Sequence, residues 1–362
     1  MADDLICDVR KAFSSGFEIQ ADLRIPLADS PVTVLFGPSG AGKTTLLRLL
    51  AGIESPDRGV IRFREETWFD SGRGINLPPQ RRRAGLLFQD YALFPHLTVA
   101  RNIEFPLRHL PKSARREKSS LLLKQFDLAD LAHHLPRTIS GGQQQRTALA
   151  RALAADPAIL LLDEPLSALD LATRARTRHE LRQRLVDARF PCVLVTHDRT
   201  EAMMLGDWMA VIVSGRIRQT GPIESVFRHP ADVQVAESIG MENVLPAAIV
   251  ARDSGLLDLQ VGSVRLHSVD TGDVAGPQVF ACIHAGDVAL TQDSVQISSA
   301  RNRLSGRVQS VTKEGPLARV ELDCGFPLVS LITAQSAEDL QLQPGNAICA
   351  VVKATSVHVI PR

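Results

Sequence analysis

The sequence predicts an α/β domain built on a parallel sheet, followed by a small all-β domain. Three short, unbroken apolar segments indicate the sheet, at residues 32–36, 158–162 and 192–195. Such strands are typical of a sheet that is buried on both faces. After about residue 240 the pattern changes to short alternating segments, such as Ala318-Arg319-Val320-Glu321-Leu322, separated by Gly, Pro, Asp and Ser. Alternation of this kind predicts half-buried strands.

Length and composition indicate a globular protein of two or three domains. The chain has 362 residues, which exceeds one ordinary hydrophobic core. Hydrophobic residues make up 44% and charged residues 22% of it, the balance of a folded globular protein. Lys and Arg number 41 against 40 Asp and Glu. This even balance lacks the basic footprint of a nucleic-acid-binding protein, so we expect no nucleic-acid partner.

The chain shows no signal for export and no membrane span. Met1-Ala2-Asp3-Asp4 is acidic and leads into no apolar stretch, so neither a secretory signal nor a presequence is expected. The apolar segments fall well short of the roughly 20 residues that span a bilayer, and any membrane role is expected to go through a partner. The widely spaced cysteines predict reduced, structural thiols rather than a zinc site or disulfides. They are Cys7, Cys192, Cys282, Cys324 and Cys349.

The elements follow in an interpretable order. The first apolar strand stops at a glycine and precedes a helical pattern at 44–51, which predicts strand, loop and helix. A mostly helical stretch follows at about 90–156, interrupted by prolines, and we interpret it as a helical insertion before the second strand. In the β region two similar units are expected, around 244–290 and 299–361, with their boundary left open.

A phosphate-binding motif lies between the first strand and its helix. The segment Gly37-Pro38-Ser39-Gly40-Ala41-Gly42-Lys43-Thr44 fits the pattern G-x-x-x-x-G-K-[ST]. Glycines let backbone N–H groups surround phosphate oxygens, and the helix N-terminus adds positive potential. Lys43 can neutralise phosphate charge, Thr44 can ligate Mg²⁺, and Thr45 continues the motif. The alternative is a chance match to the pattern.

Two acidic residues follow the second apolar strand. Asp163 is expected to hold the magnesium shell, and Glu164 to orient and deprotonate an attacking water. The alternative is a solvated strand end. Acids directly after five apolar residues need a partner, however, and a metal-bound nucleotide provides one. A nucleotide and Mg²⁺ are therefore the expected ligands of this site.

With Ile139-Ser140-Gly141-Gly142-Gln143 between those two motifs, the chain resembles an ABC transporter ATPase, whose signature has Leu where this chain has Ile139. Other matches come in the family's order: Gln89 as the Q-loop, Ser167-Ala168-Leu169-Asp170 as the D-loop and His197 as the switch histidine. The resemblance covers about residues 5–235. It implies a P-loop NTPase domain at 1–238, with a RecA-like core and an ABC helical subdomain at about 90–156.

The resemblance also implies a homodimer in which each subunit completes the other's ATP site. The residues that would meet the nucleotide from the second subunit are Ser140, Gly141, Gly142 and Gln143. Asp170 of the D-loop is also expected to bind nucleotide. Glu164, His197 and Gln89 would be catalytic, and Thr44, Gln89 and Asp163 would ligate the metal. Phe13 resembles the aromatic residue that stacks on adenine. Phe17 is a rival for that role, and either ring could be an ordinary core residue.

The segment 91–99 resembles the surface of importer subunits that receives a permease's coupling helix. This implies a partnership with an integral-membrane permease dimer and a peripheral location on the cytoplasmic face of the cell membrane. The nearby Arg81-Arg82-Arg83 could be solvated, cap a helix or face phosphate, and we assign it no catalytic role.

The last part of the chain resembles a molybdate-binding Mop/TOBE domain. The segments 299–306 and 352–357 carry the resemblance, which implies an OB-like β domain at 239–362 with a Mop-like unit at 299–361. In that family these two ends line an oxyanion pocket between paired barrels. The residues here are Ser299, Arg301, Lys353 and Thr355. The alternative is a barrel kept only for dimer contacts.

These features together predict an ATPase that drives molybdate import through a membrane permease, supplied indirectly by a periplasmic or extracellular molybdate-binding protein. Tungstate is not separated from molybdate. The alternatives on cargo are sulfate, iron or sugar, and a further alternative is an oxyanion-sensing regulatory ATPase. A nucleic-acid repair or translation ATPase is disfavoured by the net charge and by the lack of a duplicated ATPase domain.

Overall fold

The computed structural model describes residues 4–27, 32–167, 169–188, 190–272, 274, 276–292 and 299–362. Met1, Ala2, Asp3 and Ala168, on which parts of the sequence interpretation fall, lie outside these residues. The chain divides into two compact units, an N-terminal unit (1–224) and a C-terminal unit (225–362). The sequence interpretation places this boundary after residue 238 instead, so helix α8 (Val233–Ser238) falls on the other side of it.

The N-terminal unit is built on one mixed sheet, which has eleven strands in the described part of the chain. An antiparallel part comprises β6 (Ile75–Asn76), β5 (Glu66–Asp70), β4 (Arg58–Phe63), β1 (Asp4–Ala12) and β2 (Glu18–Pro26). Next comes β11 (Arg216–Pro222), which is parallel to β2 and antiparallel to β10. The sheet continues with β10 (Trp208–Val213), β3 (Val32–Phe36), β9 (Cys192–Thr196), β8 (Ile159–Asp163) and β7 (Ala84–Leu87). The predicted α/β fold with a parallel sheet is confirmed.

In the parallel half of this sheet, the segments that follow four strands lie at the same edge. β3 pairs with β9, β9 with β8, and β8 with β7, all in parallel. Every residue of β3, β8 and β9 is buried, as expected for strands covered on both faces. Since parallel strands end at the same edge, the residues that follow them lie close together.

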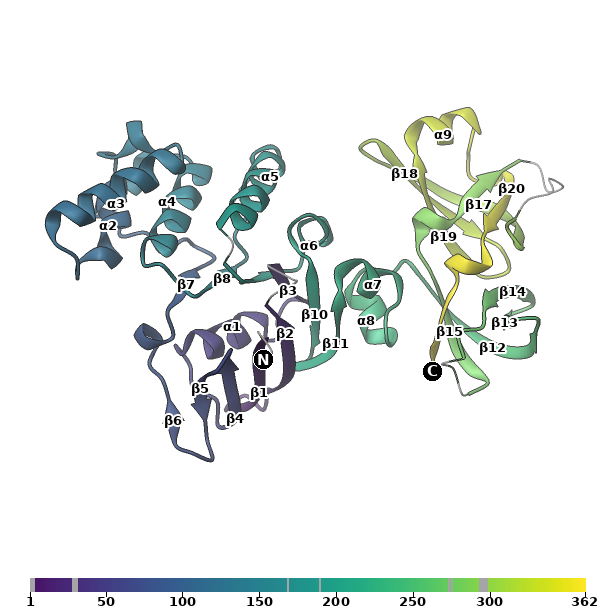
Figure 1. Cartoon of the computed structure of the whole chain (residues 1–362). Helices are drawn as coiled ribbons and strands as arrows, with labels where there is room; N and C mark the ends of the chain where they lie inside the picture. Colours follow the sequence, from purple (N-terminus) through teal and green to yellow (C-terminus); the bar gives the residue numbers. More distant parts are fainter. Residues whose placement is uncertain are drawn as a thin grey trace. The chain divides into compact units, whose positions relative to one another are not determined.

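Helices cover the sheet and form a separate group beside it (Figure 1). The helices α1 (Lys43–Ala51), α5 (Leu171–Ala188) and α6 (Arg199–Leu205) follow strands of the sheet, whereas α7 (Ile223–Arg228) crosses the boundary between the two units. The separate group comprises α2 (Val99–Glu104), α3 (Lys112–Gln125) and α4 (Gly141–Ala154), with 3-10 turns at 105–107, 129–131 and 136–138. It lies within the predicted helical insertion at 90–156. A further 3-10 turn, at 79–81, precedes β7.

A buried arginine holds the end of α1. The Arg82 guanidinium donates to Leu49 O at 2.6 Å and Leu50 O at 2.9 Å, two carbonyls of the last helical turn. It also lies over the Trp68 ring, with 5.8 Å between guanidinium carbon and ring centroid. Burial lowers the pKa of Arg82 to about 10. Because a helix end leaves its carbonyls without partners, Arg82 has the helix-capping role among those left open for the arginine triplet.

The C-terminal unit contains two five-stranded antiparallel sheets in its described residues. The first holds β14 (Val264–Val269), β13 (Leu256–Val261), β12 (Asn243–Asp253), β15 (Gln278–Ile283) and β21 (His358–Pro361). The second holds β16 (Ala289–Thr291), β20 (Ala347–Val352), β17 (Asn302–Glu314), β18 (Leu317–Asp323) and β19 (Pro327–Thr333). The short helix α9 (Ala334–Asp339) follows β19. The two expected halves therefore exchange their last strands, β16 and β21.

Matching polar contacts join the two halves. Asn243 is the first residue of β12, and its side-chain amide makes two hydrogen bonds to the backbone of Val329. Oδ1 accepts from Val329 N at 2.7 Å, and Nδ2 donates to Val329 O at 2.9 Å. Asn302 begins β17 and brackets His267 in the same way, at 2.6 and 2.9 Å. Both asparagines are buried. Each half thus satisfies buried backbone groups of the other, which fixes how the two sheets pack.

No helix in the described ranges is long and apolar enough to cross a membrane. The five cysteines are unpaired and buried. Burial raises the pKa of Cys7 and of Cys282 to about 12 each, which leaves these thiols protonated and unreactive near neutral pH.

Replacing Arg82 should destabilise the N-terminal unit. Arg82→Met leaves the Leu50 carbonyl buried without a donor and removes one of the two donors to the Leu49 carbonyl, so we expect a loss of about 2–4 kcal/mol in free energy of unfolding. Urea unfolding followed by Trp68 fluorescence, in a Trp208→Phe background, measures this loss. The matched control is Arg83→Met, because Arg83 is exposed, and a change of equal size in both variants would contradict the capping role.

Candidate active site

The loop after β3 turns sharply to reach α1. Gly37 has φ 154°, and a Cβ there would lie 2.1 Å from Ile212 O. Gly42 has φ 101°, precedes α1, and leaves only 3.1 Å between an added Cβ and the Ile19 side chain. Pro38, Ser39 and Gly40 at the tip are exposed. The glycines therefore allow a backbone path that keeps the loop tip open to a ligand.

Lys43 is the first residue of α1 and is buried beneath this loop. Its ammonium donates to Gly37 O at 2.8 Å and to Pro38 O at 2.9 Å. Burial lowers the pKa of Lys43, while the negative charges of Glu164 and Asp163 oppose that shift. The loop carbonyls thus hold a buried cation that lies close enough to two carboxylates for their charges to affect its pKa.

Thr44 and Asp163 meet across the end of the sheet. The Thr44 hydroxyl donates to Asp163 Oδ1 at 2.9 Å, although the two residues lie far apart in the sequence. Burial raises the pKa of Asp163, and the hydrogen bond from Thr44 opposes this rise. Within the described residues no cluster of three His, Cys, Asp or Glu could hold a metal by itself. A hydroxyl and a carboxylate beside a phosphate loop fit Mg²⁺, which takes few protein ligands and completes its shell with phosphate and water oxygens.

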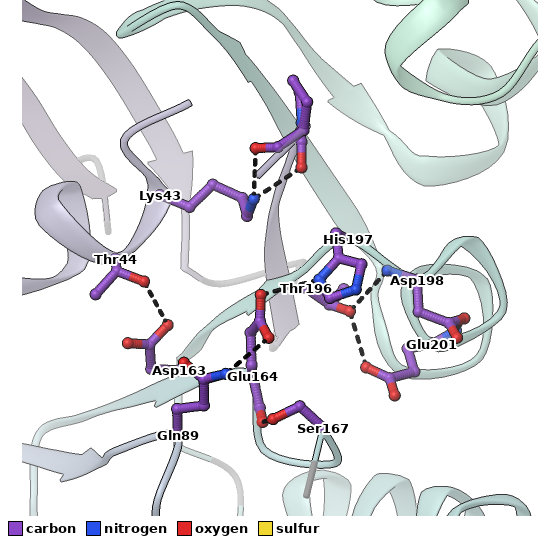
Figure 2. A network of polar contacts seen from close by, with 12 residues as sticks. Lys43, Thr44, Gln89, Asp163, Glu164, Ser167, Thr196, His197, Asp198 and Glu201 are labelled. Atoms are coloured by element: carbon purple, nitrogen blue, oxygen red, sulfur yellow. Dashed lines mark hydrogen bonds and ion pairs between the residues drawn. The ribbon is translucent and has the colours of Figure 1, made fainter. Parts of the chain in front are cut away.

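Glu164 is held between two side chains from neighbouring strand ends (Figure 2). His197 Nδ1 lies 2.9 Å from Glu164 Oε1, and Gln89 Nε2 donates to Oε2 at 3.4 Å. The Glu164 side chain is 18% exposed and that of His197 is 53% exposed. The carboxylate is therefore sheltered and oriented, while the histidine ring faces outward where a ligand can reach it.

Three residues around His197 were not singled out from the sequence. Thr196 Oγ1 donates to Glu201 Oε2 at 2.8 Å and accepts from the Asp198 backbone N–H at 3.0 Å. The Asp198 carboxylate accepts from Glu201 N at 2.9 Å and caps α6. Glu201 is buried, which raises its pKa. Asp198 followed three residues later by Glu201 is a helix-start pattern, and it could have predicted these hydrogen bonds around His197.

The glycine-rich segment at 139–143 begins α4. Ser140 caps the helix, accepting from Gln143 N at 3.3 Å, while Gln143 Oε1 accepts from Ser140 N at 2.8 Å. This reciprocal pair is a capping box. Among the described residues, no hydrogen bond joins Ser140, Gly141, Gly142 or Gln143 to the network around Lys43 in Figure 2.

Other candidate residues take definite places. Ser167 Oγ donates to Glu164 O at 2.9 Å, and Asp170 is exposed at the start of α5. Phe13 and Phe17 have ring centroids 6.1 Å apart. A Cβ on Gly42 would lie 3.3 Å from the tip of Phe17, so Phe17 is the ring in contact with the phosphate loop. Ala41 is buried and Thr45 is half-buried.

The candidate oxyanion residues precede β17 or follow β20, two neighbouring strands of the second sheet of the C-terminal unit. Ser299, Arg301, Lys353 and Thr355 are all exposed. The β17–β20 pairing ends at Asn302 and Val352, so Arg301, just before β17, and Lys353, just after β20, lie at the same end of neighbouring strands. Two exposed cationic side chains are therefore available to solvent at this end of the sheet.

Family comparisons agree with these features. The family model described as ABC transporter matches residues 21–167, and the model described as TOBE domain matches residues 298–359. A dimeric structure of the ATP-binding cassette MJ0796 in a post-hydrolysis state, bound to ADP and Pi, is 29% identical with a TM-score of 0.51. The match covers 61% of this chain and 98% of that one. The resemblance to ABC ATPases is confirmed.

Longer relatives cover nearly the whole chain. Molybdate/tungstate import ATP-binding protein WtpC of Pyrococcus horikoshii is 36% identical over 91% of this chain and 92% of its own length. Molybdenum import ATP-binding protein ModC of Pseudomonas aeruginosa is 35% identical over 98% and 99%. Spermidine/putrescine import ATP-binding protein PotA of Ruegeria pomeroyi is 42% identical over 76% and 75%. With identities above 30% across both lengths, the chain belongs to the ABC transporter family of ATPases, and it carries a TOBE domain.

Proposed function

We propose that this chain is the ATP-hydrolysing subunit that drives import of molybdate through a membrane permease. The observation that carries the proposal is the Glu164 carboxylate, held by His197 and Gln89 beside the phosphate loop. The cargo is supported by WtpC and ModC, whose names specify molybdate/tungstate and molybdenum import and whose matches span more than nine-tenths of this chain. The PotA match, although more identical, covers a smaller share.

The geometry supports a sequence of roles for ATP hydrolysis. The N–H groups of the phosphate loop and Lys43 bind the phosphates. Thr44, Asp163 and Gln89 would hold Mg²⁺, which would supply positive charge to the phosphate oxygens. Glu164 orients the attacking water and accepts its proton, acting as the general base. His197 holds Glu164 in place and contacts the γ-phosphate.

A second copy of the chain completes the site. We propose that Ser140, Gly141, Gly142, Gln143 and Asp170 of one subunit face the nucleotide bound at Lys43 of the other. The capping box leaves the Ser140 hydroxyl proton free to donate to a phosphate oxygen. The dimeric state of the solved relative supports this arrangement. ATP then stabilises the closed dimer, and its hydrolysis removes that stabilisation.

Partners and location follow from the import role. We propose that the ATPase dimer binds a permease dimer at the cytoplasmic face of the membrane, with a periplasmic or extracellular binding protein delivering molybdate to the permease. The import names of the relatives support this placement.

A second role is favoured by the C-terminal unit. The exposed Arg301 and Lys353 at one end of β17 and β20 form a cationic site that suits a dianion. We propose that this unit binds molybdate or tungstate and thereby regulates transport.

Glu164→Gln should abolish turnover without abolishing ATP binding. The amide keeps the shape of the side chain but cannot accept a proton, so we expect kcat for phosphate release to fall by at least about 100-fold. ATP affinity, measured by calorimetry, should stay close to that of the unchanged protein. The control is Glu224→Gln on α7, which should hydrolyse ATP normally. Full turnover in Glu164→Gln would exclude the proposed base.

Calorimetric titration with molybdate, tungstate, sulfate and phosphate tests the cationic site. We expect selective binding of molybdate and tungstate that is lost in Arg301→Ala and in Lys353→Ala, because each removes one of two cations. Lys313→Ala is the matched control, since Lys313 is on β17 but pairs with Glu338. Absence of binding in the unchanged protein would reduce this unit to a structural role and leave the ATPase proposal intact.

A further inference from the structure

The segment 91–98, which connects the β7 side of the active site to α2, is held by side chains from two different helices. Asn102 of α2 is fully buried. Its Oδ1 accepts from Phe94 N at 2.9 Å, and its Nδ2 donates to Leu97 O at 3.0 Å and Thr98 O at 3.1 Å. One amide thus fixes the second part of this segment to the helix that follows it.

Arg151 of α4 holds the first part. Its guanidinium donates to Ala92 O at 2.7 Å and to Tyr91 O at 2.8 Å, and lies 5.5 Å from the centroid of the Phe94 ring. Partial burial lowers the pKa of Arg151, and the charge of Asp90 opposes this shift. A planar guanidinium can bind two neighbouring carbonyls at once, which an ammonium cannot do in the same geometry.

The backbone beneath this guanidinium is strained. Tyr91 and Ala92 have φ values of 60° and 42°, in the left-handed region that non-glycine residues seldom adopt. Two consecutive residues of this kind need surrounding contacts to hold them. The Tyr91 hydroxyl supplies one by donating to Pro165 O at 3.4 Å, next to Glu164. Removing the Arg151 side chain would therefore take away contacts that hold the strained Tyr91–Ala92 turn, and this turn also contacts Pro165 beside Glu164.

The same helix carries the Ser140–Gln143 capping box at its other end. α4 runs without interruption over Gly141–Ala154, and Arg151 is in its last turn. At about 1.5 Å per residue, roughly 16 Å separates Ser140 from Arg151 along the helix axis. Whatever moves the start of α4 therefore moves Arg151 and the two carbonyls that it holds.

We propose that Arg151 is a positioning residue that transmits nucleotide engagement at the Ser140 end of α4 to the 91–98 segment, and so to whatever partner binds that segment. The inference rests on the proposed function, in which Ser140 meets the nucleotide of a second copy. Asn102 keeps the segment rigid, and Arg151 ties it to the helix that senses the nucleotide. Without Arg151, the conformation of segment 91–98 no longer responds to nucleotide binding.

Hydrogen–deuterium exchange of residues 91–98, with and without MgATP, tests this link in a Glu164→Gln background that retains ATP. We expect ATP to change exchange in this segment, and we expect Arg151→Met to lose that change while ATP affinity stays the same. Arg146→Met is the matched control, because Arg146 is on the same helix but donates to Phe126 O. It should respond to ATP as the parent does. Arg151→Lys, which keeps the charge without the fork, should respond less than the parent.

Three results would overturn the inference: no exchange response to ATP in the parent, a parent-like response in Arg151→Met or Arg151→Lys, or an equal loss in Arg146→Met. Should Arg151→Met fail to fold, Arg151→Lys decides the question. Steady-state ATPase assays of the protein with Glu164 intact separate the two proposals. A protein that hydrolyses no ATP refutes the proposed function, whereas normal hydrolysis without an exchange response refutes the role of Arg151 alone.

Discussion

Parallel pairing of β3, β9, β8 and β7 is the constraint on which the active site depends. Each of these strands ends at the same edge, and each is followed by one part of the chemistry: the phosphate loop, His197, Glu164 and Gln89. No single segment contains the site. It exists because four buried strands lie side by side in one direction, so the apolar packing of the sheet also sets the distances between the polar groups at its edge.

Much of this was predictable from the sequence because the signals are local. An apolar strand that stops at Gly37, a helix that starts after Gly42 and two acids after β8 are patterns of neighbouring residues, and their geometry follows from general rules. The ordered motifs then identified the family. The bracket of Thr196 and Glu201 around His197 is also short-range and was overlooked, although the cap at Asp198 offered a signal.

What could not be predicted depends on residues that are distant in the sequence. Arg82 is one of three consecutive arginines, and only its contacts with the end of α1 show that it is the buried one. The Asn243 and Asn302 brackets need the partner strand before their role is visible. That Phe17 lies beside Gly42 is likewise visible only in the folded chain, and the adenine-stacking role of Phe13 stays a prediction. These roles depend on side-chain burial and on contacts between residues distant in the sequence, which the periodicity of apolar residues does not predict.

The exchanged strands of the C-terminal unit bear on the order of events during synthesis. β21 completes the first sheet by pairing with β15, yet β16 to β20 of the other sheet are made between those two strands. The first sheet therefore lacks a member until residues 358–361 have left the ribosome, whereas the N-terminal unit already has all of its strands. Pairings that join such distant residues form slowly. A nascent chain thus has a complete N-terminal unit while the β15 edge still lacks its partner strand, and an unpaired strand edge of this kind is prone to aggregate.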